Sequence, residues 1–243
     1  MAWRPSIAGR SSASCPSRAS VPILEKNGTV PVNVSIPLID PVVALLGYGV
    51  LGLSPIAAHI PYFSQLYFFA ASAIMMIHRN ISLKAIGFTK PACSLTIVYT
   101  ILFAILPIAL FGITEFFLTY FYPVQMTQTA PFLVEGKRAF NLFILAPLSE
   151  ELLFRGILFS ALCRVYPLTY AVTASALLFM LAHGIWAFGP LCLGLIAAIM
   201  TYRWQSLIPG IIFHSVSNLY FPLLVGFFPK TYAIVLRLPI LMK

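Results

Sequence analysis

Residues 141–163 read NLFILAPLSEELLFRGILFSALC. It is apolar over the length of a transmembrane helix, which needs about 20 residues to cross a hydrocarbon core about 30 Å thick. It nevertheless carries two adjacent glutamates, Glu150 and Glu151, and an arginine, Arg155. Charged groups inside a bilayer are unfavourable unless they are paired or hydrated, so we expect these three to serve a function.

The whole chain has the composition of a membrane protein. Of its 243 residues, 60% are hydrophobic and 9% are charged, whereas a soluble domain carries about 25% charged residues. On a membrane protein the net charge of +9 indicates basic loops on the cytoplasmic side rather than nucleic-acid binding. We therefore predict an all-α fold, a polytopic helical bundle whose partner is the lipid bilayer, with no nucleic-acid partner.

Runs of apolar residues predict about seven transmembrane helices, within a range of six to eight. They cover 36–53, 56–77, 95–121, 139–163, 168–186, 190–202 and 207–228. The sixth run, of about 13 residues, is short for a full crossing. The segment 232–242 is apolar but contains Arg237 and Pro239, so it is either an interfacial helix or an eighth span.

The sequence divides into a tail and one membrane domain. Residues 1–35 form a basic tail, rich in Ser and Arg, that we expect to be disordered. Residues 36–243 form the transmembrane domain, with a motif-bearing core at 139–228. Residues 1–24 contain no acidic residue and suit either an organelle transit peptide or a cytoplasmic tail. We therefore expect a multi-pass protein of the cell membrane, or of an organelle membrane if the tail is a transit peptide.

Helical geometry separates the roles of the two glutamates. Glu151 and Arg155 are four residues apart and share a helix face, whereas Glu150 points about 100° away. A carboxylate–guanidinium pair neutralises both groups, so Glu151 and Arg155 are predicted to support the structure. Glu150 has no local partner and is a candidate general base that activates a water. Glu115, in the third span, is interpreted as structural or interfacial.

Two further spans carry informative residues four positions apart. FMLAH places Phe179 and His183 on one helix face, and HSVSN does the same for His214 and Asn218. Three helices can therefore direct a carboxylate, two imidazoles and an amide into one cavity. Such a set can bind a water or a metal and stabilise an oxyanion. The local zinc signature H-E-x-x-H is absent.

In this order and spacing the motifs resemble a known family. SEELLFRG carries E-E-x-x-x-R, FMLAH carries F-x-x-x-H, and SLIPGIIFHSVSN carries H-x-x-x-N. They are similar to the CPBP family of intramembrane proteases, of the CAAX prenyl endopeptidase and Abi bacteriocin-processing type. The resemblance covers about residues 141–219, and the loop AIGFTKP at 85–91 is also similar to the family. Gln205 departs from the pattern, because relatives often have glycine there.

The resemblance implies an endopeptidase that cuts a peptide or a prenylated protein at the membrane. Glu150 would activate the attacking water, and His183 and His214 would bind or orient that water or a metal. Asn218 would stabilise the oxyanion. A divalent metal such as zinc, if present, would be held by Glu150, His183 and His214, and the sequence leaves metal dependence open. The supporting residues would be Glu151, Arg155 and Phe179.

Two other classes of function are consistent with these residues. In a proton-coupled transporter Glu150 and the histidines would relay protons, although no repeated halves typical of transporters are present. A non-catalytic membrane partner or immunity protein would bind without cutting, and the complete motif set argues against it. A site shared by Glu150, His183 and His214 requires them to lie at similar depths in the bilayer. At a rise of ~1.5 Å per residue, the predicted spans place them at depths that differ by up to about 15 Å.

Overall fold

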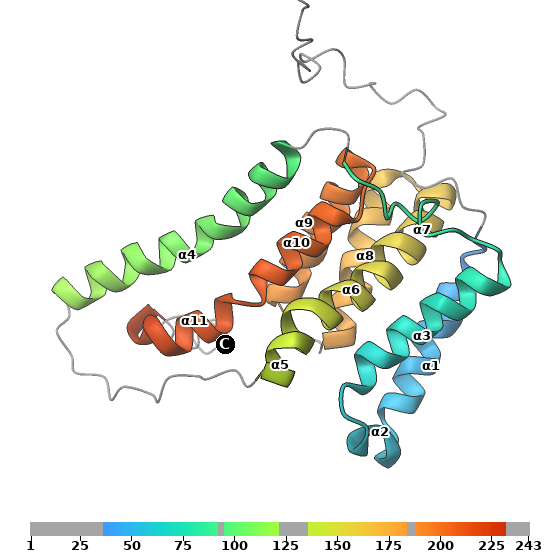
Figure 1. Ribbon diagram of the computed structural model, residues 1–243, viewed down its shortest axis with the longest axis horizontal. Helices are drawn as coiled ribbons and strands as arrows, with labels where there is room; N and C mark the ends of the chain where they lie inside the picture. Colours follow the sequence, from blue (N-terminus) through green and yellow to red (C-terminus); the bar gives the residue numbers. More distant parts are fainter. Residues whose placement is uncertain (1–35, 92–94, 122–135, 184–187, 232–243) are drawn as a thin grey trace, which may run out of the picture.

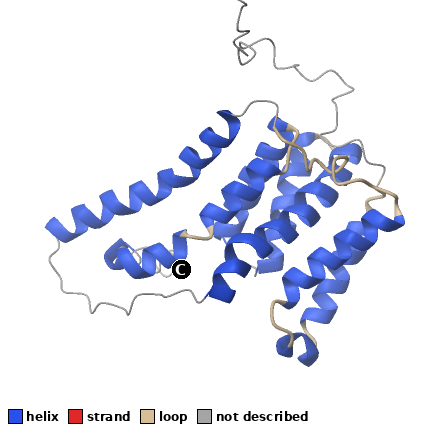
Figure 2. Ribbon diagram, in the orientation of Figure 1, coloured by secondary structure: helices blue, strands red, loops and turns tan. Residues whose placement is uncertain are grey.

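The computed structural model describes residues 36–91, 95–121, 136–183 and 188–231. Within these ranges the chain folds into helices joined by loops, with no β-strand, which confirms the all-α prediction (Figure 2). The predicted tail, 1–35, and the segment 232–242 lie outside the described residues.

The helices follow one another along the chain in a simple order. They are α1 (Ile39–Gly52), α2 (Pro55–His59), α3 (Phe63–His78), α4 (Leu95–Phe121), α5 (Gly136–Phe140), α6 (Ala146–Glu151), α7 (Ser160–Val165), α8 (Leu168–His183), α9 (Phe188–Trp204), α10 (Ile208–Ser217) and α11 (Tyr220–Phe227). Two stretches of wider, π-helical turns, η1 (Asn141–Leu145) and η2 (Leu152–Phe159), join α5, α6 and α7 into one continuous helical segment.

Proline sets several helix boundaries. A proline disfavours the helical conformation in the residue before it, and Ser54, Ile60 and Tyr166 each precede a proline and are extended. The predicted second span, 56–77, is therefore wrong as a single helix. It is divided into α2 and α3, and Tyr62 between them has a left-handed φ of 57°.

Two helical stretches are long and apolar enough, by length and composition, to cross a membrane. They are Leu95–Phe121, which matches the predicted third span, and Ile208–Phe227. The second is interrupted by a turn at Asn218 and Leu219, so the predicted span 207–228 is not one regular helix. The remaining apolar helices are shorter, and the count of seven spans stays a prediction.

The segment from α5 to α7 runs through the middle of the bundle (Figure 1). Helices α1 and α3 pack on one side of it and α8, α9 and α10 on the other, with α4 outside α10. Helix α4 packs on α10, and its buried residues are Thr96, Thr100 and Ala104, which lie on one face. Small residues of this kind let membrane helices approach closely. Much of the remaining surface of α4 is apolar and exposed.

The loop AIGFTKP docks on the turn that precedes α10. The Leu207 N–H donates to the Gly87 carbonyl over 2.8 Å, and the Ser206 hydroxyl donates to the Thr89 carbonyl. The Thr89 hydroxyl donates in turn to the Gln205 carbonyl over 3.3 Å. Gln205 itself has a left-handed φ of 51°. This loop and residues 205–207 therefore form one contact that fixes the start of α10.

Candidate active site

Glu150 lies at the centre of the candidate site. It belongs to the short helix α6, between the π-helical segments η1 and η2, and only 3% of its surface is exposed. Helical turns of the π type are rare and occur frequently at functional sites. No pattern in the sequence indicated these turns.

Two histidines from other helices face Glu150. The Nε2 atom of His183, from α8, lies 3.4 Å from Glu150 Oε2, and Nε2 of His214, from α10, lies 3.7 Å from the same oxygen. Both histidines stand in the last turn of their helices. The expected difference in depth of up to about 15 Å, counted at ~1.5 Å per residue, is therefore absent.

The other nitrogen of each imidazole is engaged by an acceptor. Nδ1 of His183 lies 2.9 Å from the carbonyl oxygen of Phe179, and Nδ1 of His214 lies 3.0 Å from Oε1 of Glu151. Because carbonyl and carboxylate oxygens only accept hydrogen bonds, each Nδ1 carries the hydrogen. Each Nε2 is left to face Glu150, where it accepts in the neutral imidazole and donates in the imidazolium.

Glu151 has two partners, of which the sequence indicated one. Its Oε1 lies 3.3 Å from Nη1 of Arg155, which is the pair inferred from the four-residue spacing, and both side chains are fully buried. The same oxygen accepts the hydrogen bond from His214. The Arg155 guanidinium also lies over the Phe179 ring, 4.3 Å from its centroid. Glu151, Arg155 and Phe179 therefore form a support beneath the two histidines.

Asn218 ends α10 and is fixed from a different helix. Its Nδ2 donates to the Leu142 carbonyl of η1 over 2.7 Å. An amide nitrogen carries two hydrogens, so the second hydrogen and the amide oxygen remain for other contacts. Asn218 also lines the cavity described next.

A cavity of about 650 Å³ opens between α4 and helices α8 to α11, and we call it the site cavity. His183, His214 and Asn218 line it, whereas Glu150 lies behind the two imidazoles. Most other lining side chains are apolar. Those from α4 are Phe103, Leu106, Pro107, Leu110 and Phe111. This contribution of α4 was not predicted, because a helix that faces only lipid has the same apolar composition as one that lines such a cavity.

The suggested metal ligands do not form a metal centre. Among the residues that the structure describes, no group of three or more His, Cys, Asp or Glu side chains is arranged to hold a metal ion. This applies to Glu150, His183 and His214 as they are placed. Metal dependence therefore stays a prediction.

Comparison with known proteins finds a family match for the part of the chain that carries the site. Residues 137–220 match the family described as type II CAAX prenyl endopeptidase Rce1-like. No significant match is found among curated proteins or solved structures. The matched range contains all three motifs and the four side chains that converge at the site. The resemblance drawn from the motifs is thus confirmed over residues 137–220, which are similar to the Rce1-like family of type II CAAX prenyl endopeptidases, and this match supports an intramembrane protease of the CPBP type.

Proposed function

We propose that this protein is a multi-pass intramembrane endopeptidase in which Glu150 activates the water that attacks a peptide bond. The family match supports a CAAX-type protease. The observation that carries the mechanism is the position of Glu150 Oε2, 3.4 Å from His183 Nε2 and 3.7 Å from His214 Nε2, behind a cavity that these imidazoles line. A buried carboxylate beside two unengaged imidazole nitrogens suits proton transfer to and from a water.

In the first step a water held by Glu150 and His183 attacks the scissile carbonyl carbon. The water transfers one proton to the Glu150 carboxylate as its oxygen forms the new bond to carbon. His183 orients this water through Nε2, because its Nδ1–H is held by the Phe179 carbonyl. The product of the step is a tetrahedral intermediate with a negatively charged oxygen.

In the second step the intermediate collapses. The remaining Nδ2 hydrogen of Asn218 donates to the oxyanion, while Glu151 holds Nδ1 of His214 and keeps its imidazole turned toward the site. Donors placed at a developing negative charge are among the largest contributions to catalysis. Glu150 returns its proton to the amide nitrogen, the carbon–nitrogen bond breaks, and a carboxyl and an amine terminus leave.

The substrate class follows from the cavity and the family. The site cavity is lined largely by apolar side chains, which suits aliphatic residues near the cut bond. A membrane-associated peptide or a prenylated protein with a CAAX terminus is therefore the proposed substrate. A transporter function predicts instead a pH-dependent flux that the same residues would carry.

A cleavage assay in proteoliposomes tests the proposal. A prenylated CAAX peptide is incubated with the wild type and with the Glu150→Ala and His183→Ala variants, with and without a chelator. We expect cleavage by the wild type only, and activity in the chelator supports the reaction written above. Loss of activity in the chelator, restored by zinc, would assign a metal to the site. Full activity of Glu150→Ala, or proton flux without cleavage, contradicts the proposal.

A further inference from the structure

A second apolar cavity adjoins the site cavity. It has a volume of about 620 Å³, lies between α4 and α9, and is called here the α4–α9 cavity. Phe103 of α4 and Ile196 of α9 line both cavities, so the two share a wall. The remaining lining residues are Tyr99, Leu102, Ile199, Met200 and Trp204, and none of them is ionisable at neutral pH.

The packing of α4 explains why this space exists. Helix α4 buries Thr96, Thr100 and Ala104 and packs on α10, whereas it is not closely packed on α9. Phe103 stands at the junction, with its ring stacked on Phe213 of α10 at 5.8 Å between centroids. The cavity is therefore a crevice between two helices that a third helix holds apart.

We propose that the α4–α9 cavity binds the isoprenoid chain of the substrate while the attached peptide occupies the site cavity. This inference rests on the proposed function. In a prenylated CAAX substrate the lipid is bonded to the cysteine beside the peptide to be cut, so its binding site must be continuous with the site cavity. The shared wall at Phe103 and Ile196 meets that requirement. The volume lies within the range of about 300–1,000 Å³ that is usual for small-molecule sites.

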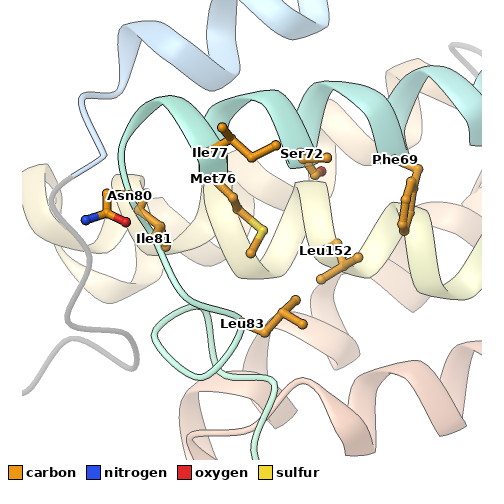
Figure 3. A pocket seen from close by; sticks show the side chains of 9 residues that line it. Phe69, Ser72, Met76, Ile77, Asn80, Ile81, Leu83 and Leu152 are labelled. Atoms are coloured by element: carbon orange, nitrogen blue, oxygen red, sulfur yellow. The ribbon is translucent and has the colours of Figure 1, made fainter.

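Two other apolar cavities do not meet the requirement. One lies between α3 and η2, where Phe69, Met76, Ile77 and Leu152 surround it (Figure 3). The other lies between α1 and α8. Neither shares a lining residue with the site cavity. The cavity in Figure 3 therefore serves as the matched control for the experiment below.

Trp204 marks the end of the α4–α9 cavity that is far from the shared wall. It stands eight residues after Ile196 on α9, or about 12 Å along the helix at ~1.5 Å per residue. The site cavity is lined by the opposite end of α9, from Gly189 to Ile196. An isoprenoid that enters at Ile196 therefore runs toward Trp204, which limits the length of chain that fits.

The experiment uses one CAAX peptide in farnesylated, geranylgeranylated and unmodified forms. The full-length protein in proteoliposomes is compared with Ile199→Trp, which enlarges a side chain that lines the α4–α9 cavity, and with Ile77→Trp, which makes the same change in the lining of the cavity of Figure 3. We expect Ile199→Trp to lower kcat/KM for the farnesylated peptide by about tenfold or more, as for a filled hydrophobic pocket. The unmodified peptide and the Ile77→Trp variant should be unaffected. Trp204→Ala should favour the longer geranylgeranyl group.

The inference is overturned if Ile199→Trp lowers kcat/KM equally for the farnesylated and unmodified peptides, or if Ile199→Trp and Ile77→Trp lower it equally. The cavity would then be a site that membrane lipid fills. A second measurement does not depend on cleavage. A peptide with a photoreactive farnesyl group should label α4 and α9 in both the wild type and Glu150→Gln, and less so in Ile199→Trp. Labelling confined to other helices overturns the inference. Correct labelling without Glu150-dependent cleavage would instead overturn only the proposed function.

Discussion

His214 and Glu151 are joined by a hydrogen bond of 3.0 Å between Nδ1 and Oε1, and the same oxygen lies 3.3 Å from Nη1 of Arg155. The second glutamate of the E-E-x-x-x-R motif thus orients an imidazole of the site and neutralises a fully buried arginine. Glu150 instead faces the Nε2 atoms of both histidines. The two adjacent glutamates are therefore expected to respond differently to substitution.

Replacing Glu151 by alanine should chiefly destabilise the fold. Arg155 would remain fully buried without its carboxylate, a situation that typically costs about 3–5 kcal/mol. Glu150→Ala should cost less, because its histidine neighbours can be neutral. The free energy of unfolding of both variants in detergent micelles checks this. Equal stability of the two variants would show that Glu151 is not the structural member of the pair.

Gly210 leaves room for the Glu151 carboxylate. A Cβ atom at this position would lie 3.3 Å from Glu151 Oε2 and 3.6 Å from Thr201 Oγ1. Gly210→Ala should therefore displace the carboxylate from His214 and lower kcat by about tenfold, although alanine favours a helix by about 1 kcal/mol. Gly226→Ala is the control, since nothing lies within 4 Å of a Cβ there. Activity of Gly210→Ala equal to that of Gly226→Ala would contradict the assigned geometry.

Gln205 occupies a backbone position that suits glycine. Its φ of 51° is left-handed, and such a conformation is unfavourable for most residues with a Cβ. Gln205→Gly removes the cost of the left-handed conformation but increases the conformational entropy of the unfolded chain. The net effect should be a free energy of unfolding that is higher by about 0.5–1 kcal/mol. Asn80→Gly, at the same φ of 51°, should gain less because asparagine tolerates this region. A melting temperature of Gln205→Gly below that of the wild type would contradict this reading.

Glu115 joins the C-terminal half of α4 to residues 230 and 231 by hydrogen bonds. Its carboxylate accepts hydrogen bonds from the N–H groups of Lys230 and Thr231, at 3.1 and 2.7 Å, and from the Thr231 hydroxyl at 2.9 Å. These amides open a helical turn that begins at Pro229, so Glu115 acts as its N-cap from another helix. Glu115→Ala should cost about 0.5–2 kcal/mol of stability. Thr231→Val, which removes only the hydroxyl contact, should cost less in the same thermal unfolding experiment.

The sequence predicted the parts of the site better than their arrangement. Spacing paired Glu151 with Arg155, because helical periodicity defines which residues share a face. The position of ionisable side chains inside apolar spans, together with the motif resemblance, selected Glu150, His183 and His214. It did not show that Glu151 also binds His214, since that contact joins residues 63 positions apart. Periodicity states which way a side chain points on its helix, but not which helix it meets.

The helix boundaries show the same limit. The described helix Leu95–Phe121 coincides with the predicted third span, because its 27 residues are long and apolar enough for one helix although Pro107 and Glu115 lie inside it. The run 56–77 was predicted as one span although Pro61 lies inside it. The prediction followed the apolar length of the run and disregarded the tendency of a proline to end a helix at the residue before it. The break of the last span at Asn218 had no such signal. That break places His214 in a last helical turn and removes the expected disagreement in depth.

The rate of peptide cleavage by Glu150→Gln is the most direct test of the mechanism. Glutamine keeps the shape of the side chain but cannot take a proton from water, so kcat should fall by about 10²–10⁴-fold. The thermal unfolding of the variant should stay close to that of the wild type. Glu115→Gln, which changes a carboxylate outside the site, should retain activity. Cleavage by Glu150→Gln within about twofold of the wild-type rate would contradict a role for this carboxylate as the general base.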